Sequence, residues 1–274
     1  MDFDLLQITV PFRMQPGLAR VDATACQLTP LDPRSALHAE KQAVWHAGQS
    51  RHALPGVDEQ AILATIAAHA PAGVDPTRPL ELQFEEDFAL LDGASGTVPW
   101  MCLCVPSHWA PEDKLGQSLS GIHAPVADAS LLQQASDALT RLVTSGEHWQ
   151  RHVWTISPSA RFDQHPKRHA RTPWPASGAS AAFDADEAFA QQCHLRAERQ
   201  SFLPVAGTTQ AVFVIRVMLQ PLTQAVSDAA RAARLHDALA SMSDAVLHYK
   251  GLDDARAPLL RWLERRAQTG QATA

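Results

Sequence analysis

The sequence has no surplus of basic residues and no long apolar run. Its 274 residues include 23 Lys and Arg against 29 Asp and Glu, which gives a net charge of −6 and a pI near 6.1. Such a chain offers no basic field for nucleic acid or an anionic membrane. No apolar run approaches the roughly 18 residues of a membrane span, and the start, Met1-Asp2-Phe3-Asp4, lacks the basic region of a secretory signal. We therefore expect a cytoplasmic protein that binds neither nucleic acid nor membrane.

Cysteine is scarce and is not spaced for metal binding. The four cysteines contain no Cys-x-x-Cys pair, which argues against zinc; they are Cys26, Cys102, Cys104 and Cys193. Cys102 and Cys104 alternate along a predicted strand, so we expect them on one face as small buried apolar residues. The sequence also lacks a dinucleotide fingerprint and the cysteine spacing of an iron–sulfur cluster.

Periodicity predicts an α+β fold in three parts that pack as one compact domain. Residues 1–79 form an N-terminal arm with helices at 35–47 and 58–70, residues 80–220 form the core, and residues 221–274 form a helical extension. Strands are predicted at 80–91, 100–105, 148–156, 193–204 and 211–219, and further helices at 129–143, 223–247 and 255–266.

Three connecting segments carry further expectations. The turn residues 92–96 should close a hairpin. The acidic run 85–87 is interpreted as a solvated face, with a carboxylate cluster near a site as the alternative. Residues 157–186 are rich in Pro, Ser, Ala and His and are predicted to form a long loop, a lid or an insertion. We expect its His165 and His169 to be solvated, with a position lining a site as the alternative.

The stretch PSHWAPEDKLGQSLSGIHAPV, residues 106–126, breaks the helical pattern twice. Gly116 permits a left-handed cap, and Pro125 disfavours the α region at the residue before it. Short broken helices of this kind form a cavity wall rather than a smooth helix face. His123, at the end of the stretch, is therefore a candidate ligand for a group inside the cavity.

Two predicted strands near the C-terminal side carry the second set of candidates. Arg196, Glu198 and Gln200 alternate along strand 193–204 and should share one face of the sheet. Arg216 lies within the apolar run VFVIRVML. Because an unpaired buried charge is costly, Arg216 either pairs with Glu198 across the strands or faces a polar cavity.

Five runs, in collinear order over residues 80–262, resemble the heme-dependent oxidative N-demethylase family at its heme-binding alpha subunit. They are EEDFALL, PSHWAPEDKLGQSLSGIHAPV, LRAERQSFLP, FVIRVMLQPL and YKGL, with a weaker match at PFRMQPGL. The resemblance implies a PAS-like fold with heme b, which uses O2 to demethylate a small secondary amine such as dimethylamine and releases formaldehyde. It also implies partner subunits that form a reductase with FMN and a 2Fe-2S cluster. This chain lacks motifs for both groups, so we expect them only on the partner subunits.

The resemblance also suggests roles for single residues. We expect His123 to be the axial ligand of the heme iron, since histidine is the usual proximal ligand of oxygen-binding heme proteins; His108 and His194 are the alternatives. Glu198 is expected to bind the amine as its ammonium ion, and Arg196 or Arg216 to orient oxygen or a heme propionate. Further cofactor contacts are expected from Lys114, Trp154 and Gln200. Met218 replaces a tyrosine common in the family, which should place a thioether near the site.

Two other functions remain open at this point. A non-catalytic heme PAS module would bind a diatomic gas or another small ligand, or shuttle electrons, but we expect no signalling output domain in this sequence. A small-molecule binding protein that has lost heme is the third possibility. We favour the heme-dependent monooxygenase.

Overall fold

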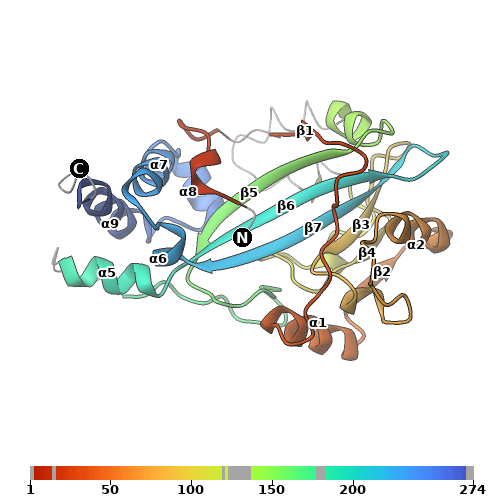
Figure 1. Cartoon of the computed structure of the whole chain (residues 1–274), viewed down its shortest axis with the longest axis horizontal. Coiled ribbons are helices and arrows are strands. Elements are labelled where there is room, and N and C mark those ends of the chain that lie inside the picture. Colours follow the sequence, from red (N-terminus) through yellow and green to blue (C-terminus); the bar gives the residue numbers. More distant parts are fainter. Residues whose placement is uncertain (1–2, 14–16, 119–120, 123–136, 177–182, 270–274) are drawn as a thin grey trace.

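The computed structural model describes the chain except for residues 1–2, 14–16, 119–120, 123–136, 177–182 and 270–274. The described residues form an α+β fold, as predicted, in which helices surround one antiparallel seven-stranded sheet (Figure 1). The spatial strand order is β1-β5-β6-β7-β3-β4-β2. The bounds are Ala19–Arg20 (β1), Arg51–Ala53 (β2), Asp87–Asp92 (β3), Trp100–Cys102 (β4), Trp149–Ser157 (β5), His194–Pro204 (β6) and Gln210–Pro221 (β7).

The predicted strands and hairpins are largely confirmed. β6 and β7 form a long hairpin, and the predicted turn at 92–96 joins β3 to β4, where Leu90 pairs with Trp100. Gly93 in this turn is closely packed, because a Cβ there would lie 2.5 Å from the Thr209 carbonyl oxygen. The strand predicted at 80–91 is shorter than expected, since a 3₁₀ turn occupies its first residues. The N-terminal arm adds the edge strands β1 and β2, which the sequence did not predict.

Capping side chains explain where several of the helices begin. The helix bounds are Leu5–Gln7 (η1), Ala36–His46 (α1), Glu59–Ala68 (α2), Leu80–Leu82 (η2), Pro111–Asp113 (η3), Phe183–Gln191 (α5), Leu222–Ala225 (α6), Ala229–Ala240 (α7), Asp244–Lys250 (α8) and Arg256–Thr269 (α9). Ser35 and Asp58 cap α1 and α2, which confirms both predictions. The single helix predicted at 223–247 is wrong, because Asp228 and Ser243 each cap a new helix inside it. In the described segments, no helix has the length and apolar character to cross a membrane.

The sheet has two faces that differ in their polar side chains. Pairing of β6 with β7 sets Glu198 opposite Val217 and Arg199 opposite Arg216. Because side chains alternate along a strand, Arg196, Glu198 and Gln200 lie on one side, here called the Glu198 face. The other side, which carries Arg199 and Arg216, is called the Arg216 face.

Apolar clusters cover both faces. Trp154 and Ile156 share the Arg216 face, as alternation along β5 predicts. At one end of this face they form one apolar cluster with Trp262 and the leucines of the C-terminal helices. At the other end α2 contributes Ile62 and Ile66. Figure 1 shows the C-terminal helices gathered beyond one end of β5–β7, and the N-terminal arm crossing in front of the sheet. The Glu198 face packs against α1 and residues 103–105.

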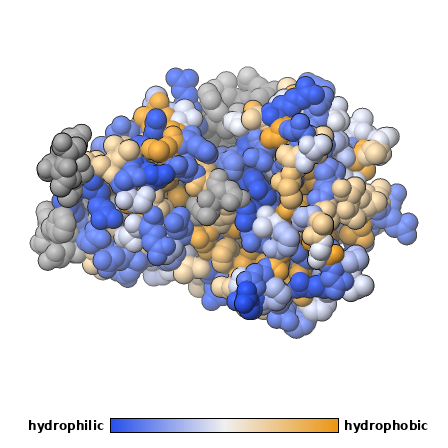
Figure 2. All heavy atoms as spheres, viewed as in Figure 1, coloured by the Kyte–Doolittle hydropathy of each residue, from blue (hydrophilic) through white to orange (hydrophobic). Residues whose placement is uncertain are grey.

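On the face of the molecule drawn in Figure 2, the hydrophobic residues that the structure describes lie in small groups between hydrophilic ones and do not form one patch. Cys102 and Cys104 are both buried, as predicted. They do not share a face, however, because β4 ends at Cys102 and the two cysteines join different clusters.

The acidic run 85–87 is not a solvated face. Glu86 is fully buried and Asp87 is 2% exposed, and Asp87 Oδ1 lies 3.1 Å from the ammonium of Lys41 on α1. The Lys41 Nζ also donates to the carbonyl oxygens of Phe84 at 2.9 Å and Glu86 at 2.7 Å. Burial opposes the charge of Lys41, but the Asp87 carboxylate raises its pKa above the ordinary value.

We expect Lys41→Met to destabilise the protein by about 3–5 kcal/mol, because it leaves the Asp87 carboxylate buried without its cation. The free energy of unfolding from urea denaturation measures this loss. Lys167→Met is the matched control, since Lys167 forms exposed ion pairs with Glu112 and Asp113 and should change stability little. Equal stabilities of the two variants would contradict the central role of the buried pair.

Candidate functional site

The half-buried carboxylate of Glu198 lies at the centre of a polar chain on the Glu198 face. Its Oε1 accepts a hydrogen bond from the Ser107 hydroxyl, and its Oε2 accepts one from Gln200 Nε2 at 2.7 Å. Each donor is bound in turn by an arginine: Arg196 Nε donates to Ser107 Oγ at 2.8 Å, and Arg151 Nε donates to Gln200 Oε1 at 2.7 Å. The prediction that Arg196, Glu198 and Gln200 share a face is confirmed.

Arg196 is a buried arginine whose guanidinium hydrogen-bonds two loops to the sheet. Besides Ser107 it donates to the carbonyl oxygens of Phe162 at 2.9 Å and Val105 at 3.2 Å, and the residue is 2% exposed. Burial lowers its pKa to about 10, while Glu198 favours its charged form. Arg196 therefore contacts Glu198 through Ser107 and is positioned by protein groups on several sides.

The loop over Arg196 is itself held by charged side chains. Glu40 on α1 accepts from the backbone nitrogens of Phe162 and Asp163 at 3.2 and 2.7 Å. Asp163 in turn binds both Arg168, at 2.8 Å, and His169, at 3.0 Å. The side chain of Arg168 also donates to the carbonyl oxygen of residue 104. This part of the predicted loop 157–186 is thus fixed to the core.

Arg216 does not join this site. It lies on the opposite face, where its Nε is 2.7 Å from Glu85 Oε2, and its neighbour across the strands is Arg199. Arg199 pairs with Glu86 at 3.0 Å. The predicted Arg216–Glu198 bridge is therefore wrong, because one step along a strand moves a side chain to the other face.

Trp154 and Met218 also lie on the Arg216 face, away from Glu198. Both are buried in the cluster formed with the C-terminal helices and do not share the face of Glu198. The expected contact of Trp154 with a cofactor stays a prediction. Trp154 accepts, through its carbonyl oxygen, a 2.7 Å hydrogen bond from Lys250 Nζ. That nitrogen lies 5.4 Å from the ring centroid of Phe12 and 5.5 Å from that of Trp154. Burial lowers the pKa of Lys250 to about 8, while Glu198 opposes the shift.

The predicted broken-helix stretch leads toward the Glu198 face. After η3, Gly116 adopts the expected left-handed conformation with φ of 74°. Leu115 and Ile122 pack against the apolar cluster of that face, and Lys114 Nζ lies 3.4 Å from the Ile122 carbonyl oxygen. His123, the predicted axial ligand, lies outside the described residues.

Both alternative histidine ligands lie in the described part of the chain. His108 follows Ser107 in a left-handed conformation, with φ of 61°, which is uncommon for a residue with a side chain. Burial, with help from Arg171 and Arg196, lowers its pKa to about 4. His194 begins β6 on the Glu198 face, and burial lowers its pKa as well. Its buried Nδ1 has no hydrogen-bond partner among the described residues.

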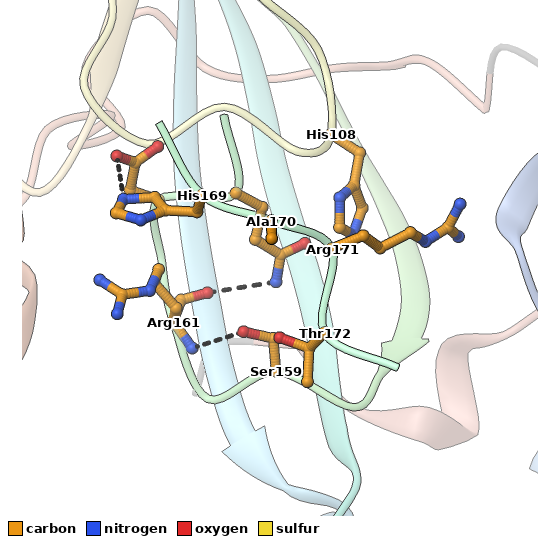
Figure 3. Close-up of a pocket in the computed structure, with 9 residues that line it drawn as sticks. His108, Ser159, Arg161, His169, Ala170, Arg171 and Thr172 are labelled. Carbon is orange, nitrogen blue, oxygen red and sulfur yellow. Dashed lines mark hydrogen bonds and ion pairs between the residues drawn. The ribbon is translucent and has the colours of Figure 1, made fainter. Parts of the chain in front are cut away.

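A pocket lies beside His108 at this end of the site (Figure 3). His108 and Arg171 lie on one side of it in this view, and Arg161 and His169 lie on the other. Its lining residues are His108, Ser159, Arg161, Asp163, Gln164, His169, Ala170, Arg171 and Thr172. The expectation that His165 is solvated is wrong, since the residue is 2% exposed and its Nε2 lies 3.0 Å from Glu112.

Sequence reasoning missed Ser107 and Arg151. Ser107 lies in the PSHW run, where only His108 was predicted as a candidate ligand. Arg151 belongs to a predicted strand, and its alternation with Val153 and Thr155 could have placed it beside Gln200. Neither signal identifies a partner on its own, because both hydrogen bonds join segments far apart in the sequence.

A comparison with known families supplies the remaining information. The model of the family described as haem-dependent oxidative N-demethylase, alpha subunit-like, matches residues 56–260. This chain belongs to that family. The matched region includes the whole polar chain around Glu198 and the stretch that contains His123.

The described residues are compatible with a heme nearby. Heme iron needs a single axial side chain from the protein, and the pKa values of His108 and His194 favour the neutral imidazole that binds iron. Because one ligand suffices, the absence of a group of three or more metal-binding side chains among the described residues does not conflict with heme. Trp109, Leu115 and Ile122 offer apolar surface on the Glu198 face.

We expect His108→Asn to make the protein less sensitive to acid. The unfolded chain takes up a proton at His108 near its ordinary pKa of 6.5, while the folded protein resists until about 4, so stability falls as the pH drops through this range. Asparagine tolerates the left-handed backbone and does not titrate. Urea midpoints of parent and variant at about pH 7 and about pH 5 measure the effect. His46→Asn, at the exposed end of α1, is the control, and equal acid losses in parent and His108→Asn would contradict the expectation.

Proposed function

We propose that this chain is a heme-dependent monooxygenase that removes a methyl group from a small secondary amine. One oxygen atom of O2 enters formaldehyde and the other enters water, with two electrons and two protons supplied from outside. A partner reductase with FMN and a 2Fe-2S cluster provides the electrons. Family membership supports the heme-dependent oxidative demethylation, and the substrate, heme b and the reductase are parts of the proposal.

The carboxylate of Glu198 is the observation that carries this proposal. It is half-buried, and its hydrogen-bond donors among the described residues, Ser107 and Gln200, are both neutral. Its charge also interacts with the positive charges of three side chains, those of Arg196, Arg151 and Lys250. We propose that its remaining acceptor positions bind a cationic ligand such as an ammonium ion. Its neighbours across the strands are Val153 and Val217, which offer apolar contacts for methyl groups. A diatomic gas carries no positive charge, so this site favours the enzyme over the gas-binding module.

Each proposed residue has a defined task. Glu198 binds and orients the ammonium ion, Arg196 and Gln200 support that carboxylate, and heme, when bound, supplies the activation of dioxygen. We propose His123 as the axial ligand, with His108 and His194 as alternatives, and Lys114 and Gln200 as cofactor contacts. Arg216, Trp154 and Met218 are left out because they lie on the other face of the sheet.

A PAS-like arrangement is part of the same proposal. The hairpin β3–β4 is followed by short helical turns and then by β5, β6 and β7. In the sheet, the first hairpin lies beside β7, the last of these strands. This order supports a cofactor pocket between the helical turns and the Glu198 face.

We expect the protein produced with a heme supply to show a Soret band that shifts on reduction and again with CO, since one coordination position must stay open for oxygen. His123→Ala should abolish stoichiometric heme binding, and absorption spectroscopy with heme quantification measures it. His46→Ala is the control at an exposed histidine. An unchanged heme spectrum in His123→Ala would reject the axial assignment, and His108→Ala and His194→Ala would then identify the ligand.

Glu198→Gln should retain heme but bind amines about tenfold more weakly or worse, because it loses a charge-assisted interaction. Amine-induced shifts of the heme absorption band measure this affinity. Glu59→Gln changes an exposed carboxylate on α2 and should titrate like the parent. Identical amine titrations of Glu198→Gln and the parent would count against the proposed function.

A further inference from the structure

Ser107 and Gln200 bind the Glu198 carboxylate in the same arrangement. Each is a neutral side chain placed between an arginine and one oxygen of the carboxylate. Arg196 binds the first and Arg151 binds the second. In the hydrogen bonds of the described residues, Glu198 is bound by Ser107 and Gln200, and each arginine is bound to one of these two neutral side chains.

The arginines fix the direction of these hydrogen bonds. A guanidinium has no acceptor, so Arg196 must donate to the Ser107 oxygen, and the single hydroxyl proton of Ser107 is left for Glu198. Arg151 likewise occupies the carbonyl oxygen of Gln200, which turns the amide N–H groups toward Glu198. Both neighbours therefore present only donors to the carboxylate.

This arrangement leaves a defined number of acceptor positions. A carboxylate has about four lone-pair positions, two on each oxygen. Ser107 fills one on Oε1 and Gln200 fills one on Oε2, so the hydrogen bonds among the described residues leave one position per oxygen for a ligand. A protonated secondary amine has two N–H groups, a tertiary amine has one, and a quaternary ammonium ion has none.

The backbone around Ser107 suits a positioning role. The loop is anchored by Asp87, whose Oδ2 accepts from the backbone nitrogens of Cys104 and Val105 at 2.9 and 2.7 Å. After Ser107, the backbone changes direction at His108, which has the left-handed conformation. Ser107 is thereby held over Glu198 from both sides.

We propose that Ser107 is a positioning residue that, with Gln200, makes Glu198 a receptor for two N–H donors of one ammonium ion. The inference rests on the proposed function and adds a basis for its specificity. Ser107 acts through Glu198 and does not itself contact the ligand. The site should therefore discriminate among methylated ammonium ions by their number of N–H groups as well as by size.

The test is a calorimetric titration of the heme-loaded full chain with the chlorides of methyl-, dimethyl-, trimethyl- and tetramethylammonium. We expect the parent to bind dimethylammonium at least about tenfold more tightly than tetramethylammonium, since hydrogen bonds to a charged group are the strong ones. Ser107→Ala should lower this ratio severalfold by freeing the carboxylate to rotate. Ser107→Thr keeps the hydroxyl and should restore the ratio. Ser145→Ala, at an exposed serine, is the matched control.

The outcomes separate this inference from the function it rests on. A purely structural role of Ser107 would weaken all four cations equally, so an unchanged ratio in Ser107→Ala overturns the inference and leaves the proposed function standing. A parent that binds none of the four cations rejects the amine function and the inference with it. If Ser107→Ala does not fold, Ser107→Cys decides, because a thiol keeps the shape but is a weaker donor, and the ratio should fall.

Discussion

The buried pair of Lys41 and Asp87 determines where the other parts of the site lie. Lys41 joins α1 to the start of β3, and the second oxygen of Asp87 holds the backbone of residues 104 and 105. From Val105 the connection passes through Arg196 to Ser107, and so to Glu198. Burying two charges costs free energy that only a complete set of hydrogen bonds offsets, and here both partners have several. A helix near the N-terminus thus fixes a carboxylate more than 150 residues later in the sequence.

The two faces of the sheet differ in what their charged side chains contact. On the Arg216 face, Glu86 accepts from the backbone nitrogen of Thr29 at 2.8 Å, and Arg199 donates to the carbonyl oxygen of Gln27 at 3.0 Å. These contacts fasten the N-terminal arm across the sheet. On the Glu198 face, the carboxylate accepts hydrogen bonds from the neutral side chains of Ser107 and Gln200, and an arginine binds each of these donors in turn. Arginines that are neighbours in the sequence, Arg196 and Arg199, therefore have different tasks because they differ in parity along one strand.

Local patterns predicted the elements of this fold, and long-range contacts limited the rest. Strand alternation placed Arg196, Glu198 and Gln200 together because that property depends on one strand alone. The burial of Asp87 depends on Lys41 and that of Glu86 on Arg199, and no local pattern connects either pair. The partner of Arg216 depends on the register between strands, which the sequence of one strand does not contain. Ser107 was missed for a similar reason: a single serine in a loop has no periodicity, and its role arises only from the two side chains that it joins.

The contact of Lys250 with Trp154 and Phe12 has a consequence for the order of assembly. It joins the N-terminal arm, the edge of β5 and the C-terminal end of α8, three segments separated by most of the chain. Contacts between such distant segments form late, because closing long loops costs entropy before any contact offsets it. During synthesis on the ribosome, this contact cannot form until residue 250 has emerged. A nascent chain that carries every residue of the carboxylate site therefore still lacks the contact by which Lys250 joins Trp154 and Phe12.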